Sequence, residues 1–368
     1  MSDRGVDIAD DDGWLAVIGG RAAGADRGWH DLSEDIAAMH AANWLTACLP
    51  RSGGGRGWGT QPAGTIAAFD ALRKLGQVSL PAARLFEGHM NAVKLVHLYA
   101  SDELARDVYE TVQTGTLLGV WGADMPGEPL TLERSGDAVA LSGAKQYCSG
   151  LGMVGLAIVT GTLAGEQRLV ILPVTDADRM DAESWSMSAM RATLSGSYRF
   201  DGLTVHADRL LGAAGDYQTE PYFEGGIWRY CAAHLGAAEA LYAAMRSALV
   251  ESGRAEAPMQ TLRLVQAAIA LETARLWIRR AAEEIEADEA PPRKAVLALL
   301  AREVTRQSCD DVLSSVEQAL GMAAHDGASA IDRMRRDLRL YLCQAAPDAK
   351  LTRAAGGLLA GPGTAEAL

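Results

Sequence analysis

Residues 190–212 read MRATLSGSYRFDGLTVHADRLLG, and this stretch decides the fold. Apolar and polar residues alternate in it, which puts one face of a strand on a core and the other toward solvent or a partner. Short apolar runs punctuated by Gly, Asp and Pro precede it, among them AVALSG, GLAIVTG and RLVILPV. We therefore predict a β domain over residues 119–212. The apolar residues of its alternating stretch are Tyr198, Phe200, Leu203 and Val205.

The residues before this domain have helical spacing. We predict an N-terminal helical domain over residues 1–118, interrupted by the glycine-rich run RSGGGRGWG at 51–59, which is expected to be a surface loop. In the segment LFEGHMNAVKLVHLYA, four apolar residues can share one buried stripe: Leu85, Val93, Val96 and Tyr99.

Helical spacing returns after the β domain and lasts almost to the end. Pro291 and Pro292 end one long helix and start another. The pattern predicts a C-terminal four-helix bundle over residues 213–355 and a tail, 356–368, that frays. Starting near Thr261, one series follows helical steps: Leu262, Val265, Ile269, Thr273 and Leu276.

Composition excludes several classes of function. A formal net charge of −13 argues against nucleic-acid binding, which needs clustered Lys and Arg, although a small anionic ligand stays compatible with it. No apolar run approaches the roughly 20 residues of a membrane span, and the acidic N-terminus is unlike a signal peptide. Five scattered cysteines without metal-ligand spacing favour a cytoplasmic protein with reduced thiols and no metal: Cys48, Cys148, Cys231, Cys309 and Cys343.

The order of helices, β domain and helical bundle resembles the acyl-CoA dehydrogenase superfamily of flavoproteins. GAKQYCSG at 143–150 resembles the family segment G-x-K-x-[WY]-x-[ST]-[NG], and residues 190–212 resemble its R-x-T-x-S strand and the L-L-G that follows. QALGMAAHDGASAIDRMRRDLRLY resembles its Q-x-x-G-G-x-G segment followed by R-D. The resemblance implies a mainly α protein with a central β-barrel or sandwich, an FAD cofactor and a homodimer or homotetramer.

The flavin ring needs an aromatic wall and hydrogen bonds to its polar rim. Residues two apart on a strand share a face, so Tyr147 and Ser149 can address one side of the cofactor. By resemblance, Tyr147 lies against the flavin and Ser149 bonds its N5 edge, while Trp121 and Gly122 contact it through their backbone. The alternatives are a half-buried tyrosine, a solvated serine and a core tryptophan.

For the adenosine half of FAD, the resemblance implies Arg254 on the pyrophosphate of a neighbouring subunit, with Gln318 and Gly321 on the adenosine side. A guanidinium suits phosphate because it presents a bidentate fork. The family's Phe-Gly reads Ala-Pro at 257–258 and its second glycine reads Met322. An exposed loop arginine is the alternative.

Both family locations of the proton-abstracting carboxylate hold residues that accept no proton, namely Ala345 and Gly226. General-base catalysis contributes about 100-fold to 10,000-fold, so its loss requires a substitute or different chemistry. Glu224 and Asp348 are displaced candidates, and a solvated carboxylate is the alternative identity of each.

His89 is the second catalytic candidate, because the family places its helix along the substrate pocket and the branch resembling dibenzothiophene monooxygenases uses a histidine from this region. Imidazole titrates near neutrality. Asn91 and Glu87 lie nearby on the same helix, and a structural histidine is the alternative. The usual CoA-facing arginine reads Ile227, with Arg229 two residues later, so the substrate stays open.

Three functions follow. The first is FAD-dependent hydride transfer from an acyl thioester, or a similarly activated small molecule, to flavin N5. The second is a monooxygenase of the same fold using a C4a-(hydro)peroxyflavin. The third is a non-catalytic flavin-binding or scaffold protein. Electron-transfer flavoprotein or oxygen is the expected acceptor.

Overall fold

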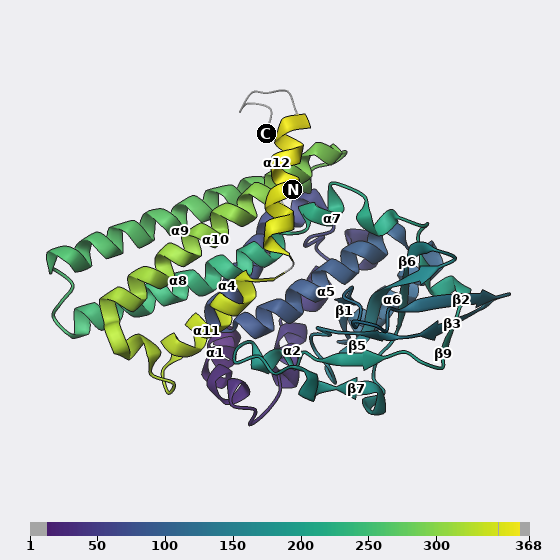
Figure 1. The fold of residues 1–368 in the computed structure, drawn as a ribbon, viewed down its shortest axis with the longest axis horizontal. Helices are drawn as coiled ribbons and strands as arrows, with labels where there is room; N and C mark the ends of the chain where they lie inside the picture. Colours follow the sequence, from purple (N-terminus) through teal and green to yellow (C-terminus); the bar gives the residue numbers. More distant parts are fainter. Residues whose placement is uncertain (1–12, 345, 361–368) are drawn as a thin grey trace, which may run out of the picture.

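The computed structural model describes residues 13–344 and 346–360. Figure 1 shows the β domain at one end of the molecule and the long helices α8, α9 and α10 at the other, with α5 between them. The N-terminal helices are α1 (Gly13–Asp26), α2 (Ser33–Ala41), α3 (Trp44–Ala47), α4 (Thr65–Val78), α5 (Leu80–Tyr99) and α6 (Asp102–Gln113). The C-terminal helices are α7 (Tyr222–Gly225), α8 (Trp228–Glu251), α9 (Pro258–Ile285), α10 (Ala295–Leu320), α11 (Ala330–Leu342) and α12 (Pro347–Ala360).

The central β domain, which the alternating sequence predicted, has two sheets. In the larger sheet the order is β10-β6-β5-β2-β3-β9, and β1 pairs in parallel with β5. The smaller sheet has the order β4-β8-β7. The alternating residues Tyr198 and Phe200 are buried, and Leu203 and Val205 are half-buried. The strands are β1 (Leu117–Trp121), β2 (Thr131–Ser135), β3 (Ala138–Ser142), β4 (Ala144–Lys145), β5 (Val154–Leu163), β6 (Glu166–Pro173), β7 (Met180–Asp181), β8 (Ser197–Arg199), β9 (Leu203–His206) and β10 (Leu210–Leu211).

Helix α4 packs against the bundle helices α8 and α9. Two glycines allow the backbones of α4 and α8 to come into contact. A Cβ at Gly236 would lie 2.0 Å from the carbonyl oxygen of Arg73, and one at Gly76 would lie 2.3 Å from that of Ala233. No side chain fits at either contact. This approach places α8 directly beside the N-terminal domain.

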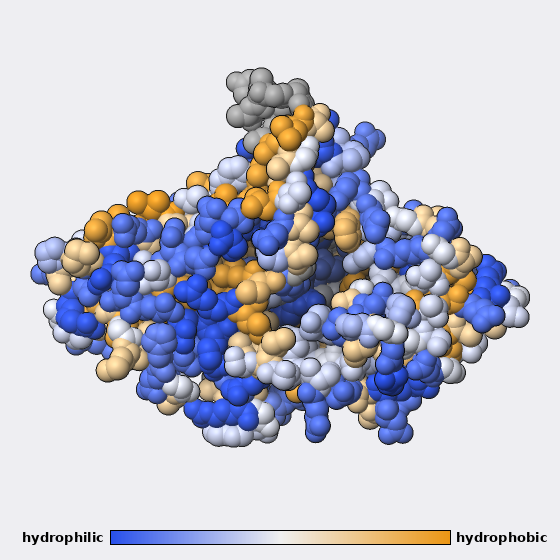
Figure 2. Space-filling view, viewed as in Figure 1, coloured by the Kyte–Doolittle hydropathy of each residue, from blue (hydrophilic) through white to orange (hydrophobic). Residues whose placement is uncertain are grey.

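The apolar face of α9 lies on the outside of the bundle. Leu262 is 47% exposed, Val265 51%, Ile269 62% and Leu276 57%. In the space-filling view, an orange band of apolar side chains follows α9 (Figure 2). The inner face consists mostly of alanine, which allows close helix packing. The buried residues of α9 are Ala267, Ala270, Ala274, Ile278, Ala281, Ala282 and Ile285.

Two segments differ from their expected form. The glycine-rich loop is only half a surface loop, because residues 57–60 are buried and the Gly59 carbonyl accepts a hydrogen bond of 2.8 Å from Arg229. Helix α12 continues to Ala360, although we expected the chain to fray from residue 356. Across the described parts of the chain, every helix is too short or too polar to cross a membrane.

We predict that Gly236→Ala lowers the free energy of unfolding by about 3 kcal/mol, because overpacking against an immovable backbone costs more than overpacking against a side chain. Gly20→Ala on α1 is the matched control, since nothing lies within 4 Å of the added Cβ. There, alanine is expected to stabilise the helix by about 0.5 kcal/mol. Urea unfolding of both variants measures the difference, and equal effects would contradict the close approach of α4 and α8.

Candidate functional site

A cleft of about 690 Å³ opens between the β domain, α5 and the C-terminal helices. This volume lies within the range that holds a cofactor or drug-sized ligand. The predicted residues Trp121, Gly122, Tyr147, Ser149 and Glu224 all line it. Further lining residues are Arg84, Glu87, Asn91, Lys94, Ala123, Gln146, Trp185, Met190, Thr193, Ser195, Tyr217, Phe223, Gly226, Arg229, Tyr230, Tyr341, Gln344 and Lys350.

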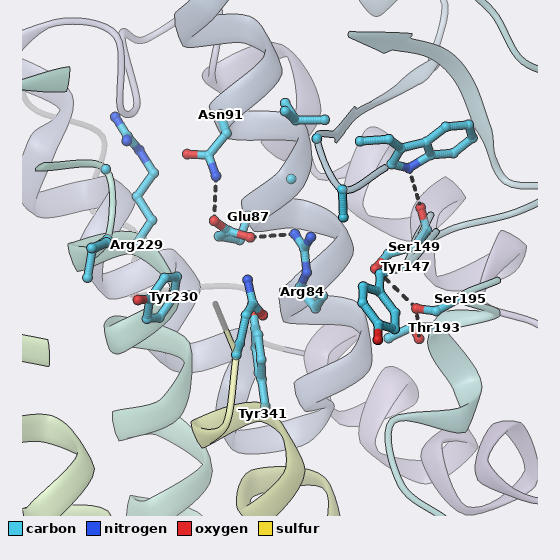
Figure 3. A pocket seen from close by; sticks show the side chains of 18 of the residues that line it. Arg84, Glu87, Asn91, Tyr147, Ser149, Thr193, Ser195, Arg229, Tyr230 and Tyr341 are labelled. Atoms are coloured by element: carbon cyan, nitrogen blue, oxygen red, sulfur yellow. Dashed lines mark hydrogen bonds and ion pairs between the residues drawn. The ribbon is translucent and has the colours of Figure 1, made fainter. Parts of the chain in front are cut away.

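A row of three hydroxyls forms the β-domain wall of the cleft. Thr193 Oγ1 donates to the Met190 carbonyl oxygen at 2.7 Å and lies 2.7 Å from Ser195 Oγ, which in turn lies 3.1 Å from Ser149 Oγ. Trp121 Nε1 donates to the Ser149 carbonyl oxygen at 3.1 Å, so the indole is fixed beside the row. In Figure 3, dashed lines link these hydroxyls one to the next. The wall offers hydrogen bonds next to a flat aromatic surface.

Tyr147 stands at the mouth of this wall in a strained backbone conformation. We expected Tyr147 to lie on a strand. It lies after the strand instead, because β4 ends at Lys145. Its φ of 57° is left-handed, which costs a bulky residue on the order of 1 kcal/mol or more. The flanking amides hold it there, since Gln146 N–H donates to Ala123 and Cys148 N–H to Gly196. Strain maintained in this way is typical of functional sites.

Lys145 belongs to the GAKQYCSG motif, but the sequence alone assigned it no role. In the structure it anchors the turn after β1. Its fully buried Nζ donates to Asp124 Oδ1 at 2.5 Å, Thr160 Oγ1 at 2.9 Å and the Gly122 carbonyl oxygen at 3.3 Å. Burial lowers the pKa of Lys145, and the Asp124 carboxylate acts against that shift. The ammonium thus fixes the backbone of residues 122–124 at the edge of the cleft.

The Arg-Asp pair on α11 holds the loop that carries Thr193. Asp337 Oδ1 accepts the Met190 N–H at 2.6 Å, and Arg336 donates to the Ser188 carbonyl oxygen at 2.7 Å. Met190 has a φ of 53°. Burial raises the pKa of Asp337 to about 6, although its hydrogen bond to Met190 opposes the shift.

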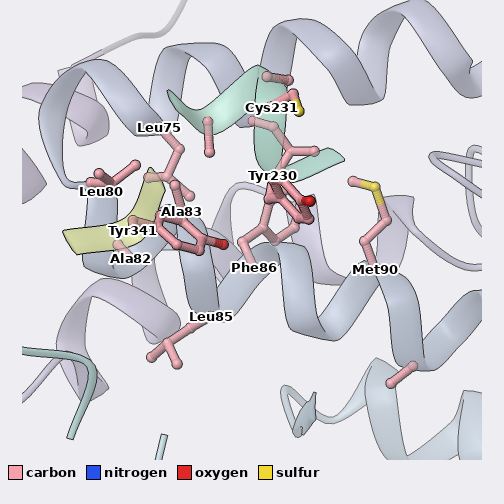
Figure 4. Packing of buried hydrophobic residues seen from close by; sticks show 14 of the residues in the cluster. Leu75, Leu80, Ala82, Ala83, Leu85, Phe86, Met90, Tyr230, Cys231 and Tyr341 are labelled. Carbon is pink, nitrogen blue, oxygen red and sulfur yellow. The ribbon is translucent and has the colours of Figure 1, made fainter. Parts of the chain in front are cut away.

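The opposite wall is built on α5 around a buried carboxylate. Glu87, 3% exposed, pairs through Oε2 with Arg84 Nη1 at 2.6 Å and accepts from Asn91 Nδ2 through Oε1. Tyr341 rises toward this pair from α11, and Tyr230 lies beside it (Figure 3). Burial, and next the Glu87 carboxylate, raise the pKa of Tyr341, so its phenol keeps its proton. Apolar side chains pack behind both tyrosines (Figure 4).

Of the two expected base positions, Gly226 lines the cleft and Ala345 lies outside the described residues. Glu224 is buried and engaged by two cations of α12, with Lys350 Nζ at 2.7 Å from Oε2 and Arg353 at Oε1. Accepting a proton would break one of these ion pairs. Through these ion pairs Glu224 ties α7 to α12. Asp348, the other displaced candidate, does not line the cleft.

His89 does not reach the cleft, contrary to the catalytic role expected for it. The ring is fully buried; its Nδ1 accepts the Leu118 N–H at 3.1 Å and its Nε2 donates to the Leu45 carbonyl oxygen at 3.1 Å. Burial lowers the pKa of His89 to about 4, so it stays neutral near pH 7. Its role is to join α5 to the backbones of α3 and β1.

The residues expected at the adenosine half lie together but away from the cleft. Arg254 is exposed in the connection of α8 and α9, where Nη1 donates to the Ala319 carbonyl oxygen at 3.3 Å. Gln318 and Gly321 are exposed at the nearby end of α10. This end of the bundle is remote from the β domain (Figure 1). Within the described residues, no His, Cys, Asp or Glu cluster is arranged to hold a metal ion.

The residues in or beside the cleft that we did not predict had unequal sequence signals. Thr193, Ser195 and Lys145 belong to segments that we matched to the superfamily, so attention to their hydroxyl and amine groups would have found them. Tyr230 and Tyr341 gave no signal, because an isolated tyrosine on a helix resembles any half-buried aromatic residue.

Comparisons with known proteins support the fold. No protein-family profile matches the chain. A dibenzothiophene monooxygenase from Rhodococcus erythropolis is 25% identical over 200 residues, which span 51% of this chain and only 47% of that relative. Methanesulfinate monooxygenase MsuC from Pseudomonas fluorescens superposes with a TM-score of 0.81, 19% identity and 95% coverage of both chains. The complex of TdsC from Paenibacillus sp. A11-2 with FMN and indole gives the same four values. The predicted acyl-CoA dehydrogenase-like fold is confirmed.

We predict a pH-dependent effect of Asp337→Asn. Because the folded pKa of about 6 exceeds the unfolded value of 3.8, the contribution of Asp337 to stability is full below pH 3.8 and is lost as pH rises through 6. The uncharged amide of the variant avoids this loss, so the stability of the variant relative to wild type should rise by up to about 3 kcal/mol between pH 4 and pH 7. Urea unfolding at both pH values measures it. Asp326→Asn controls for net charge, and a pH-independent difference for Asp337→Asn would contradict the assignment.

Proposed function

We propose that the protein is a flavin-dependent monooxygenase that uses oxygen as its acceptor. The observation that carries this proposal is the cleft itself, in which a hydroxyl and aromatic wall faces a buried polar group while Gly226 leaves the base position without a carboxylate. The curated relatives that the chain matches over about half their length act on dibenzothiophene by monooxygenation. A monooxygenase is the second of the three functions that the sequence predicts.

The β-domain wall fits a bound flavin. A tricyclic ring requires a flat surface, and a Cβ at Gly122 would meet nothing closer than 3.7 Å, so the backbone there is open to a ligand. Ser149 and Ser195 can supply hydrogen bonds to the polar rim, and Tyr147 can cover one side. When bound and reduced, a flavin activates oxygen for transfer of one oxygen atom.

The chain's own residues supply binding, orientation and exclusion of water. Trp121, held by its bond to Ser149, limits where a ring can lie. Tyr217, whose pKa burial raises to about 12, remains a hydrogen-bond donor in the cleft. The ion pairs of Glu224 with α12 hold the helix that borders the opening, which keeps water from the interior.

FMN is the form of the cofactor that a single chain supports best. The ring and its side chain need only the cleft, whereas the adenosine of FAD would need Arg254 and Gln318 of a second subunit. The Phe-Gly expected near Arg254 is also absent. FAD therefore remains the second form to test, together with the oligomer that it requires.

Hydride transfer from an acyl thioester receives less support. That reaction needs a carboxylate within hydrogen-bonding reach of the α carbon. Gly226 supplies none, and the Glu224 oxygens are occupied by cations. Glu87 is likewise paired with Arg84. Oxygen rather than electron-transfer flavoprotein is accordingly the acceptor we propose.

We predict that the purified protein retains a flavin and, once the flavin is reduced, transfers one labelled atom from isotopically labelled oxygen gas to a ligand such as indole, read by mass spectrometry. Ser149→Ala should lower this rate about tenfold through loss of a hydrogen bond to the cofactor, whereas Ser142→Ala, at an exposed position of β3, should leave it unchanged. Mass spectrometry of the released cofactor separates FMN from FAD. Failure to bind either flavin, or anaerobic bleaching by acyl-CoA, would overturn the proposal.

We also propose a homodimer or homotetramer that covers the apolar face of α9. Exposed contiguous apolar patches are rare on monomeric proteins and mark interaction surfaces. Leu262, Val265, Ile269 and Leu276 provide such a patch along several turns of one helix.

The double substitution Val265→Glu and Ile269→Glu is expected to give monomers, because two carboxylates would be buried without partners in the interface. Analytical ultracentrifugation measures the mass in solution. Val17→Glu on α1, at an exposed valine of similar exposure, is the matched control and should leave the oligomer intact. A monomeric wild-type protein would refute this assembly.

A further inference from the structure

We propose that the substrate carries a carboxylate group, which binds at Lys94 of α5 and Arg229 of α8. This inference rests on the proposed monooxygenase function and names the chemical class of its substrate. It starts from the observation that these two buried cations share one carboxylate, that of Glu286. Among the described residues of this group, Lys94 and Arg229 line the cleft and Glu286 does not. A ligand in the cleft therefore meets the cations and not their carboxylate.

The group has one more positive than negative charge. Lys94 Nζ lies 2.9 Å from Glu286 Oε2, and Arg229 Nη2 lies 2.6 Å from Oε1. Burial alone would raise the pKa of Glu286, but Arg229 and Lys94 hold it below its usual value, so the carboxylate stays ionised. His97 adds no charge near pH 7, because burial and the neighbouring Lys94 lower its pKa. An uncompensated buried charge is costly, and an anionic ligand would offset it.

Both cations also have hydrogen-bond donors to spare. Within the described residues, the two hydrogen bonds of Arg229, to Glu286 and to the Gly59 carbonyl oxygen, both come from Nη2. A guanidinium has five N–H donors, so about three remain on Nη1 and Nε, and Nε is buried without a partner. Lys94 Nζ donates to Glu286 and, at 3.3 Å, to the Thr60 carbonyl oxygen, which leaves about one of its three donors. A carboxylate offers only acceptors and matches this surplus.

Gly226 leaves the Arg229 guanidinium open to the cleft. Gly226 lines the cleft, and a Cβ at this position would lie only 3.0 Å from Arg229 Nη1. Any other residue would therefore crowd Nη1, whereas glycine leaves room for a ligand atom. In the view of Figure 3, Glu87 lies between Arg229 and Ser149. The carboxylate subsite is thus separate from the hydroxyl wall that we propose for the flavin.

The other cations at the cleft are balanced by an equal number of carboxylates. Two groups are involved: the pair Arg84 and Glu87, and the four residues Lys350, Arg353, Glu220 and Glu224. In the second group Lys350 and Arg353 share Glu224, but Glu220 supplies another carboxyl group, which accepts the Glu224 N–H at 3.0 Å. The surplus of positive charge therefore lies at Lys94 and Arg229.

The neighbouring lining suits an apolar body attached to the carboxylate. Leu95, Tyr222 and Ile227 line the cleft, and Lys94 Nζ lies 5.1 Å from the centre of the Tyr222 ring. Such side chains favour hydrocarbon parts of a ligand. A single surplus charge also matches a monoanion better than the phosphate group of FMN, which carries up to two negative charges. The structure thus favours a carboxylate of the substrate over the flavin phosphate as the occupant.

Pairs of a carboxylate and its primary amide provide the test, because the two have similar shape and differ in charge. Calorimetric titration of flavin-saturated protein with 3-phenylpropanoate and hexanoate, each against its amide, should show at least one carboxylate binding at least about tenfold more tightly. Arg229→Gln and Lys94→Gln should each reduce this ratio to below about threefold and leave the affinity for the amide unchanged. Arg275→Gln, at an exposed arginine that pairs with Glu272 on α9, is the matched control and should preserve the ratio.

Equal or tighter binding of the amide in both pairs, or a ratio unchanged in both cleft variants, would overturn the inference. Lys94→Gln keeps the test decisive if Arg229→Gln fails to fold, because a glutamine amide can still donate to Glu286. Weaker binding of FMN but not of riboflavin by Arg229→Gln would assign the subsite to the flavin phosphate and refute the substrate class. A protein that retains flavin without preferring carboxylates would refute the substrate class alone, whereas a protein without flavin would refute the proposed function.

Discussion

The buried hydrogen bond from Met190 N–H to Asp337 is the constraint on which the cleft depends. It joins α11, near the C-terminal helix α12, to the loop that carries Thr193 and Ser195. Met190 and Leu194 both have left-handed backbones, with φ of 53° and 42°. Conformations of this kind persist only where surrounding bonds over-determine them. Arg336 adds such a bond to the same loop and another to Asp26 on α1, so three distant segments fix one wall.

The fold could be predicted from the sequence because its signals are local. The alternation around Tyr198 identifies strands, and the proline pair at 291–292 separates two helices. Periodicity predicts which residues share a face of a helix, but it does not predict which face packs against the rest of the protein. On α9 the larger apolar residues such as Ile269 lie outside, while alanines such as Ala274 face the bundle. Close helix packing needs small side chains, and only the three-dimensional arrangement shows where this need arises.

The cleft lining was predictable only where its residues belong to one motif. Ser149 and Trp121, which line the cleft, could be singled out because the segments around them have a fixed order along the chain. The position of His89 outside the cleft lining could not be predicted, because its chemistry is visible in the sequence and its partners are not: Leu45 and Leu118 come from other elements. The position of Glu87 and Tyr341 in one cleft was unpredictable for the same reason, because the two residues come from different elements. Their meeting across 254 positions of sequence depends on how α11 packs, which no local pattern encodes.

The two walls of the cleft differ in how they are held, and this difference bears on how one fold can serve several substrates. Backbone bonds and the buried Lys145 ammonium fix the β-domain wall, so a substitution there disturbs strained turns. The opposite wall consists of side chains from α5, α8 and α11, whose helical backbones tolerate exchange of one residue for another. A solved structure with only 19% identity has the same fold at a TM-score of 0.81. One fold can therefore present different side chains to a ligand. Substitutions on the helical wall change the polarity of the cleft, and the β-domain wall does not have to move.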